Sequence, residues 1–101
     1  MSICYLNGNF VELSKASISP LDRGFLFGDS VYEVLAAYEK NLFRLDDHME
    51  RLKKNLESLS IKIALENSEI KSILQKVCEK NPEENQIIYL QISRGAEAIR
   101  N

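Results

Sequence analysis

Residues 31–38 read Val31-Tyr32-Glu33-Val34-Leu35-Ala36-Ala37-Tyr38. β-Branched and aromatic side chains of this kind favour an extended strand, in which successive side chains point to opposite faces. One face would then carry Tyr32, Val34, Ala36 and Tyr38, and the other Val31, Glu33, Leu35 and Ala37. The chain is expected to turn at residues 39–41 and to return as a short strand at residues 42–43. This segment therefore predicts the central strand of a sheet.

Two amphipathic helices are expected downstream of this strand. Apolar residues recur three and four positions apart in two stretches, which is the period of an α-helix with one buried face. The first stretch contains Leu45, Met49, Leu52, Leu56 and Leu59, and the second contains Ile70, Ile73, Leu74, Val77 and Cys78. They predict a helix over residues 46–60, capped by Asp46 or Asp47, and a helix over residues 68–80, capped by Asn67 or Ser68. Asn81-Pro82 should end the second helix, because proline disfavours helical geometry in the residue before it.

The flanking segments predict further strands and loops. Asn7-Gly8 tolerates positive φ at both centres of a tight turn, so residues 3–6 and 9–13 are expected to form a hairpin. Residues 17–24 predict an irregular loop, residues 86–93 a returning strand, and residues 94–101 a polar loop. We expect an α+β fold in which two helices pack on a small, mostly antiparallel sheet, with residues 1–101 forming one domain.

Composition and charge narrow the class of protein. The chain has 45% hydrophobic and 28% charged residues, which is typical of a folded globular protein. Its formal net charge is −2, with the basic residues interspersed among acids, so neither nucleic acid nor a membrane surface is an expected partner. The sequence shows no signal peptide and no apolar run near the ~20 residues that cross a bilayer. Its two cysteines, Cys4 and Cys78, are expected to be inert core thiols of a cytoplasmic protein.

The common catalytic motifs are absent from the sequence, which has one histidine, no metal-ligand cluster, no nucleophile elbow and no phosphate loop with its lysine. Three ordered blocks of sequence are what indicates a function. The blocks are Asp22-Arg23-Gly24-Phe25-Leu26-Phe27-Gly28-Asp29-Ser30-Val31-Tyr32-Glu33, Leu45-Asp46-Asp47-His48-Met49-Glu50-Arg51-Leu52 and Gln91-Ile92-Ser93-Arg94-Gly95. Together with Tyr5-Leu6-Asn7-Gly8 they resemble the amino-terminal domain of the fold-type IV, or class IV, pyridoxal-phosphate (PLP) enzymes. This family contains D-amino-acid aminotransferases, branched-chain aminotransferases and aminodeoxychorismate lyases, and the resemblance is closest to the D-amino-acid (D-alanine) aminotransferases.

The resemblance implies an activity for a complete enzyme. It would bind pyridoxal 5'-phosphate, form a homodimer, and exchange an amino group between an amino acid and a 2-oxo acid, with a D-amino acid favoured by Tyr32. In the family, a lysine that forms the Schiff base and a glutamate at the pyridinium nitrogen lie in a carboxy-terminal domain. None of the eight lysines here lies in a matching motif. The 101-residue chain is therefore expected to hold no catalytic residue and to be inactive alone.

The resemblance also implies site residues. Arg51 matches the arginine that binds the cofactor phosphate, a role that suits the planar fork of a guanidinium. Tyr32 matches a tyrosine whose hydroxyl lies near the substrate carboxylate. Arg100 is the candidate for an arginine that holds the substrate acid, although it falls one position later than the family pattern. We expect Arg51 at the rim of a cleft near Tyr32.

Other interpretations stay open. Arg51 could be a solvated helix charge, Tyr32 a core side chain with a satisfied hydroxyl, and Arg100 an exposed tail residue. Glu33 is expected to be a half-buried acid paired with an arginine, His48 a packing or capping residue, and Arg94 a support for its loop. At the level of function, the alternatives are the lyase and branched-chain members of the family, a non-catalytic dimerisation or binding module, and an unrelated small α+β domain.

Overall fold

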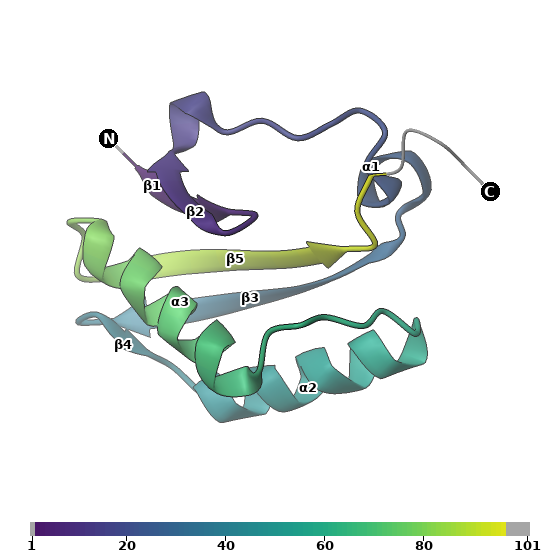
Figure 1. The fold of residues 1–101 in the computed structure, drawn as a ribbon. Helices are drawn as coiled ribbons and strands as arrows, with labels where there is room; N and C mark the ends of the chain where they lie inside the picture. The colour runs from purple at the N-terminus through teal and green to yellow at the C-terminus, as the bar shows by residue number, and fades with distance from the viewer. Residues whose placement is uncertain (1, 97–101) are drawn as a thin grey trace.

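A computed structural model of the chain describes residues 2–96. The elements in chain order are β1 (Ile3–Leu6), β2 (Asn9–Glu12), a 3-10 turn η1 (Leu13–Lys15), α1 (Arg23–Phe27), β3 (Ser30–Tyr38), β4 (Asn41–Leu42), α2 (Leu45–Ser58), α3 (Asn67–Lys80) and β5 (Gln86–Ser93). The strands form two antiparallel sheets, β1-β2 and β4-β3-β5. Figure 1 shows the β1-β2 hairpin above β5 and α2 below β3. The α+β fold class is confirmed, but the single sheet that we expected is divided into two.

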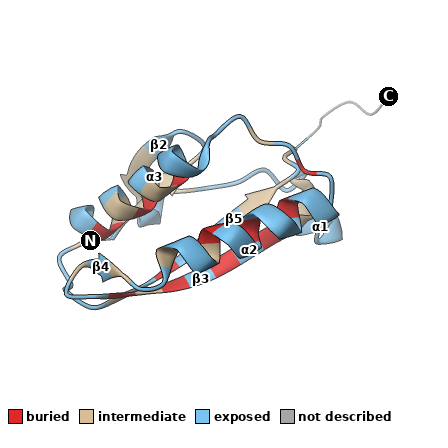
Figure 2. Ribbon diagram, turned by 90° about the horizontal axis from the view of Figure 1, so that it is seen from below, coloured by how far each residue is buried: buried red, intermediate tan, exposed pale blue. Residues whose placement is uncertain are grey.

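The core lies between the inner face of the three-stranded sheet and the two long helices. Burial alternates along β3 as predicted, and the helices bury most of the apolar stripes predicted from the sequence. Leu59 is the exception, because it lies after the end of α2 and is 41% exposed. The buried apolar residues are Val31, Leu35, Ala37, Met49, Leu52, Leu56, Ile61, Ile70, Leu74, Cys78 and Ile88. Figure 2 shows buried segments in red along β3 and on the sides of α2 and α3. Burial of this apolar surface is the main stabilising term of the fold.

The two long helices begin differently from the prediction. Arg44, at φ 53°, precedes α2, and no side chain caps this end. Asp46 and Asp47 lie inside the first turn, where they complement the helix dipole instead of capping. Before α3, the backbone N–H of Glu66 donates to the Glu69 carboxylate at 3.2 Å, so the predicted caps of this helix also lie within its first turn.

A short helix, α1, begins in the last two residues of the loop that we predicted over residues 17–24 and continues to Phe27. Asp22 caps it, because its Oδ1 accepts the backbone N–H of Gly24 at 2.8 Å. Gly28, at φ 65°, ends it in the left-handed conformation that favours glycine. Residues 2–96 therefore contain three α-helices where the sequence predicted two, and the acid before α1 and the glycine after it were the available signals.

The amino-terminal hairpin turns as predicted, and Asn81 at the end of α3 joins it to that helix. Asn7 and Gly8 adopt positive φ values of 48° and 98°. Asn81 ends α3 in an extended conformation, and its Oδ1 accepts the backbone N–H of Ile3 at 2.9 Å. Its Nδ2 donates to the carbonyls of Ile3 at 2.9 Å and Val77 at 2.8 Å. One amide side chain thus joins β1 to the last turn of α3.

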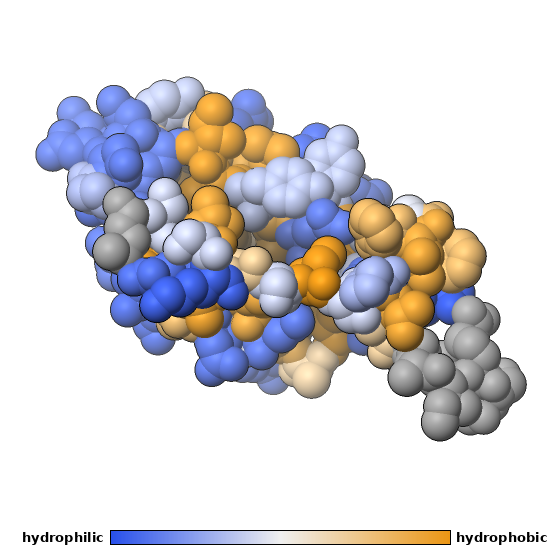
Figure 3. Space-filling view, turned by 90° about the horizontal axis from the view of Figure 1, so that it is seen from above, coloured by the Kyte–Doolittle hydropathy of each residue, from blue (hydrophilic) through white to orange (hydrophobic). Residues whose placement is uncertain are grey.

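The outer face of the three-stranded sheet is apolar and exposed. Its exposed apolar residues on β3 and β5 are Tyr32, Val34, Tyr38, Ile87 and Tyr89. The apolar residues of α1 are exposed as well, and they are Phe25, Leu26 and Phe27. Figure 3 shows a hydrophobic cluster at the end of the molecule where α1 lies. Among the described residues β5 pairs only with β3, so its other edge has no strand partner, although the β1-β2 hairpin lies beside it (Figure 1). No helix within residues 2–96 has both the length and the apolar character needed to cross a bilayer.

Candidate functional site

A buried carboxylate, that of Glu33, lies at the centre of the candidate site. It points inward from β3 and is 2% exposed. It accepts hydrogen bonds from Arg51 at 2.9 Å to Nε and 2.8 Å to Nη2, and Nδ1 of His48 lies 2.7 Å from its Oε1. Because a carboxylate only accepts, this Nδ1 is the donor. His48 and Arg51 are three positions apart on α2, so the helix presents both to the same strand residue.

The electrostatics of this cluster favour an ionised pair. Hydrogen bonding from Arg51 is the main cause that lowers the pKa of Glu33, with a smaller contribution from His48, and burial opposes both. The same hydrogen bonds raise the pKa of Arg51, and Tyr32 adds a minor contribution of the same sign. The structure corrects one expectation, because Glu33 is fully buried and not half-buried. Its arginine partner, which the sequence could not identify, is Arg51.

Arg51 keeps an open side although it is paired. Its side chain is 64% exposed, and its hydrogen bonds to Glu33 use Nε and Nη2. Within residues 2–96, Nη1 has no hydrogen-bond acceptor. The guanidinium is therefore fixed along one edge and free to donate along the other. Such an arrangement can bind an anion with two oxygens at the spacing of a phosphate or carboxylate.

Tyr32 lies on the opposite face of β3 from this cluster. It is 60% exposed and stacks on Tyr89 with ring centroids 5.7 Å apart, so it is not a core residue. β4 pairs with β3 only at Ala37 and Tyr38, which leaves the edge of β3 free of a neighbouring strand beside Tyr32 and Glu33. A ligand at this edge could be reached from both faces. Arg100 lies outside the described residues.

A second charged cluster joins the end of β5 to the start of β3. Nε of Arg94 and Nε of Arg23 donate to Oδ2 of Asp29, at 2.6 and 3.2 Å. Arg94 also donates to the carbonyls of Leu59 at 2.6 Å and Ser60 at 3.3 Å, beyond the end of α2. These contacts agree with the expected supporting role of Arg94. The role of Asp29 was missed, although the residue lies in the most distinctive sequence block.

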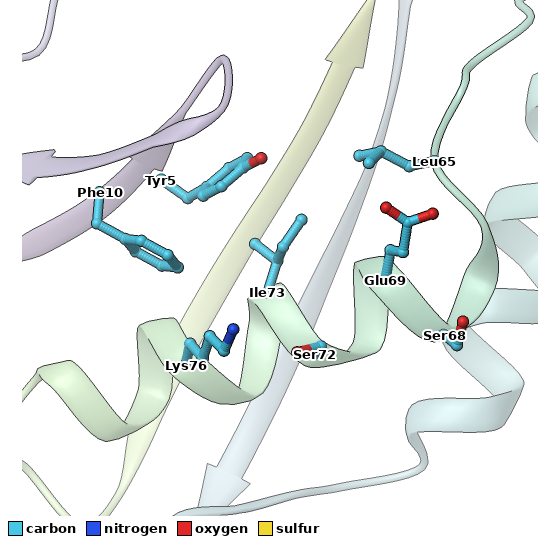
Figure 4. A pocket seen from close by; sticks show the side chains of 8 residues that line it. All are labelled: Tyr5, Phe10, Leu65, Ser68, Glu69, Ser72, Ile73 and Lys76. Atoms are coloured by element: carbon cyan, nitrogen blue, oxygen red, sulfur yellow. The ribbon is translucent and has the colours of Figure 1, made fainter.

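Two hollows on the surface lie away from these residues. One, of about 400 Å³, lies between the hairpin and α3 and is lined by Tyr5, Phe10, Leu65, Ser68, Glu69, Ser72, Ile73 and Lys76. Figure 4 shows its two aromatic rings on the hairpin side, facing Ile73 and Lys76 of the helix. The other, of about 340 Å³, lies beside Leu56 and Ile70. Arg51 and Tyr32 line neither hollow, so neither of them is the cleft that we expected beside Arg51. The candidate site is instead the open edge of β3 beside Tyr32 and Glu33.

Comparison with known sequences identifies relatives of the chain. The family model described as "Amino-transferase class IV" matches residues 30–100. A D-alanine aminotransferase of Bacillus licheniformis is 38% identical over 89 residues, covering 88% of this chain and 31% of the relative. A D-alanine aminotransferase of Staphylococcus epidermidis is 35% identical over 101 residues, covering 100% of this chain and 36% of the relative. The chain thus spans about a third of the length of these relatives.

Solved structures share the fold. A T.th. branched-chain amino acid aminotransferase, complexed with N-(5'-phosphopyridoxyl)-L-glutamate, superposes with a TM-score of 0.89 at 27% identity, covering 98% of this chain and 35% of that one. The branched-chain aminotransferase of Escherichia coli gives a TM-score of 0.82 at 24% identity, covering 88% of this chain and 32% of that one, and supports the fold alone. Since the family model matches more than half of the sequence, and the curated relatives exceed 30% identity, this chain belongs to the class IV aminotransferase family.

Proposed function

We propose that this chain is the amino-terminal, phosphate-binding part of a PLP-dependent aminotransferase. The complete enzyme would move an amino group between an amino acid, with D-amino acids favoured, and a 2-oxo acid. The observation that carries this proposal is the guanidinium of Arg51, which a buried carboxylate holds on one edge while the other edge stays exposed. Family membership and the 35% to 38% identity to D-alanine aminotransferases support the reaction class.

The residues present fit the phosphate of the cofactor. A phosphate needs donors that stay cationic and that are oriented before it binds. Glu33 orients the guanidinium of Arg51 through two hydrogen bonds. His48 donates a third hydrogen bond to the Glu33 carboxylate, which limits the rotation of that carboxylate. The guanidinium of Arg51 is cationic at every pH at which enzymes work, and its hydrogen bonds to Glu33 raise its pKa further. Arg51 would therefore bind the phosphate, with Glu33 and His48 as its supports.

Tyr32 is placed to act from the other face of the same strand. Its hydroxyl group belongs to an exposed side chain that Tyr89 braces by ring stacking. Across the free edge of β3, a ligand bound by Arg51 would lie within reach of this side chain. We assign Tyr32 to the substrate carboxylate, and Arg100 to the same substrate group as an expectation from the family pattern.

The chemistry itself belongs to the cofactor, because pyridoxal phosphate supplies the electron sink for transamination when it is bound. The residues of this chain would bind and orient the cofactor phosphate and the substrate. We assign the Schiff-base lysine and the glutamate at the pyridinium nitrogen to a carboxy-terminal domain that this chain does not include, so the chain alone should be inactive. A homodimer is proposed on family grounds. The free thiols of Cys4 and Cys78 support a reducing compartment such as the cytoplasm.

The first test measures anion binding by the 101-residue chain. Inorganic phosphate and pyridoxal 5'-phosphate are titrated into the native chain and into the Arg51→Ala variant, with Arg44→Ala as the control. Arg44 also donates through Nε to an aspartate on α2, but both partners are exposed. We expect Arg51→Ala to weaken binding about tenfold or more, as loss of a bidentate charged donor implies, and Arg44→Ala to change it less than about twofold. Equal effects of the two variants would contradict the assignment.

The second test addresses the reaction. The complete enzyme that carries this chain is assayed with D-alanine, L-alanine and a branched-chain L-amino acid, each with a 2-oxo acid acceptor. Preference for D-alanine is expected, whereas preference for the branched-chain substrate would favour that branch of the family. Transamination by the purified 101-residue chain, with a cofactor imine that borohydride reduces, would show that the lysine has been assigned to the wrong part of the protein.

A further inference from the structure

We propose that Asp29 and Arg94 are positioning residues, whose ion pair fixes the direction in which the chain leaves β5 at Gly95. This inference rests on the proposed function, because the residues that follow Gly95 lead to Arg100, the candidate substrate-binding arginine. The cluster shares no residue with the pair formed by Glu33 and Arg51. It lies at the opposite end of α2 from the first turn of that helix, and it links four elements, α1, α2, β3 and β5.

Asp29 is held by both side chain and backbone. Its side chain is 16% exposed and accepts from Arg94 at 2.6 Å and from Arg23 at 3.2 Å. Its carbonyl accepts the backbone N–H of Arg94 at 3.1 Å, and its own N–H donates to the Arg23 carbonyl at 3.2 Å. The hydrogen bond from Arg94 is also the main cause that lowers the pKa of Asp29. Arg94 is therefore attached to Asp29 at two points, which fixes both its position and its side-chain direction.

The same guanidinium reaches α2. Nη2 and Nη1 of Arg94 donate to the carbonyls of Leu59 and Ser60, at 2.6 and 3.3 Å. A cation at this end complements the helix dipole and satisfies carbonyls that have no partner within the helix. Lysine could keep the charge but could not contact Asp29 and both carbonyls in one plane, because it lacks the guanidinium fork. Arginine at position 94 thus fastens the end of β5 to the helix that carries Arg51.

The first residue after this attachment is held as well. Gly95 adopts φ 90°, its N–H donates to Oγ of Ser93 at 3.1 Å, and its carbonyl accepts from the N–H of Arg23 at 2.8 Å. Oγ of Ser93 in turn donates to Oδ2 of Asp22 at 3.0 Å. Asp22 forms an isolated antiparallel bridge with Ala96. The backbone path at residues 93–96 is therefore set by side chains that come from before α1 and from the start of β3.

This arrangement makes a specific functional prediction. If the cluster only stabilised the fold, weakening it would lower stability and the fraction of folded enzyme, so the apparent kcat would fall while KM and the Kd of the cofactor stayed unchanged. If it positions the loop, weakening it should impair substrate binding and leave cofactor binding intact. The two possibilities separate in a comparison of KM, kcat and cofactor affinity.

The test uses Arg94→Lys and Asp29→Asn in the complete enzyme, with Asp47→Asn as the matched control. Asp47 also accepts from an arginine Nε, at 2.9 Å, but its side chain is 61% exposed. For the two cluster variants we expect KM for D-alanine to rise about tenfold, with kcat and the Kd of pyridoxal phosphate changed less than about threefold. Amide exchange at residues 93–96 should become faster in both variants and stay unchanged in Asp47→Asn.

The outcomes are distinct. An unchanged KM or unchanged amide exchange at residues 93–96 overturns the inference, and so does a rise in KM that is matched by a fall in kcat and by a rise in the Kd of pyridoxal phosphate. Circular dichroism identifies any variant that fails to fold, in which case the other variant decides. A native enzyme without transaminase activity contradicts the proposed function instead. An active native enzyme whose variants keep their KM contradicts only the positioning role.

Discussion

Glu33 and Arg51 lie 18 residues apart in the sequence, and the carboxylate of the first accepts two hydrogen bonds from the guanidinium of the second. The pair connects a buried position on β3 with an exposed position on α2. It therefore contributes to the packing of the helix on the sheet and to the orientation of the proposed phosphate ligand. Changes at Glu33 should affect both properties.

Replacement of Glu33 by glutamine should lower the free energy of unfolding by about 1–3 kcal/mol. The amide would set its own N–H groups against the donors of Arg51 and His48, which leaves buried polar groups poorly paired. Urea denaturation of the native and variant chains measures the difference. Asp47→Asn, which removes an exposed partner of Arg44, should change stability by less than about 0.5 kcal/mol. Similar losses in the two variants would show that burial of the Glu33 pair has no special effect.

Acid should destabilise the chain through Glu33 and Asp29, the two paired carboxylates whose pKa values are lowered in the folded state. The folded-state pKa values of Glu33 and Asp29 lie below their ordinary values of 4.5 and 3.8, mainly because of hydrogen bonds from Arg51 and Arg94. Their contribution is complete above the ordinary values and is lost as pH falls through the folded-state values, because the unfolded chain takes up protons first. Denaturation midpoints measured from about pH 7 down to about pH 3 should decline below about pH 4.5. The decline should be shallower in Glu33→Gln, and an identical acid profile would exclude Glu33 as a cause.

Substitution of Asn81 by alanine should loosen the amino-terminal hairpin selectively. The side chain makes two hydrogen bonds to Ile3 and one to the carbonyl of Val77, and alanine keeps none of them. We expect a loss of about 1–3 kcal/mol, with faster amide exchange in residues 3–12 and little change in β3 and β5. Asn55→Ala, at an exposed position of α2, is the control and should leave the hairpin unchanged. Uniformly faster exchange across the chain would mean that the hairpin does not open as a separate unit.

The exposed outer face of the sheet should make the 101-residue chain self-associate. Ile87 is 79% exposed and Tyr89 59% exposed on the same face as Tyr32, and apolar patches of this kind mark contact surfaces. Sedimentation velocity should show association of the native chain, reduced in Ile87→Lys. Asn55→Lys adds the same charge at an exposed position of α2 and should not reduce self-association. A native chain that stays monomeric at high concentration would argue against this surface as a contact.

The sequence predicted those features that depend on local pattern. Alternation along β3, the stripe that α3 buries, and the end of α3 at Asn81 each follow from spacing or from a single backbone preference. α1 was missed because a helix of five residues is too short to show a period. Its capping aspartate and terminal glycine are informative only when they are considered together.

The partner of Glu33 could not be identified from the sequence. The strand pattern placed this acid on the inner face, and Arg51 was singled out by family resemblance, but nothing local joins the two. Their contact requires α2 to pack along β3 in one register, which depends on the whole core. The division into two sheets has a similar origin, since strand pairing between distant segments is a tertiary property.

β5 offers eight residues of backbone whose outer amides and carbonyls have no strand partner among residues 2–96. Where the β1-β2 hairpin does not cover this edge, its unpaired main-chain groups are a template to which an extended segment of another molecule could add. Concentrated solutions of the chain should therefore be vulnerable to templated fibril growth, and a lysine at an inward-facing edge position would serve as a gatekeeper against it.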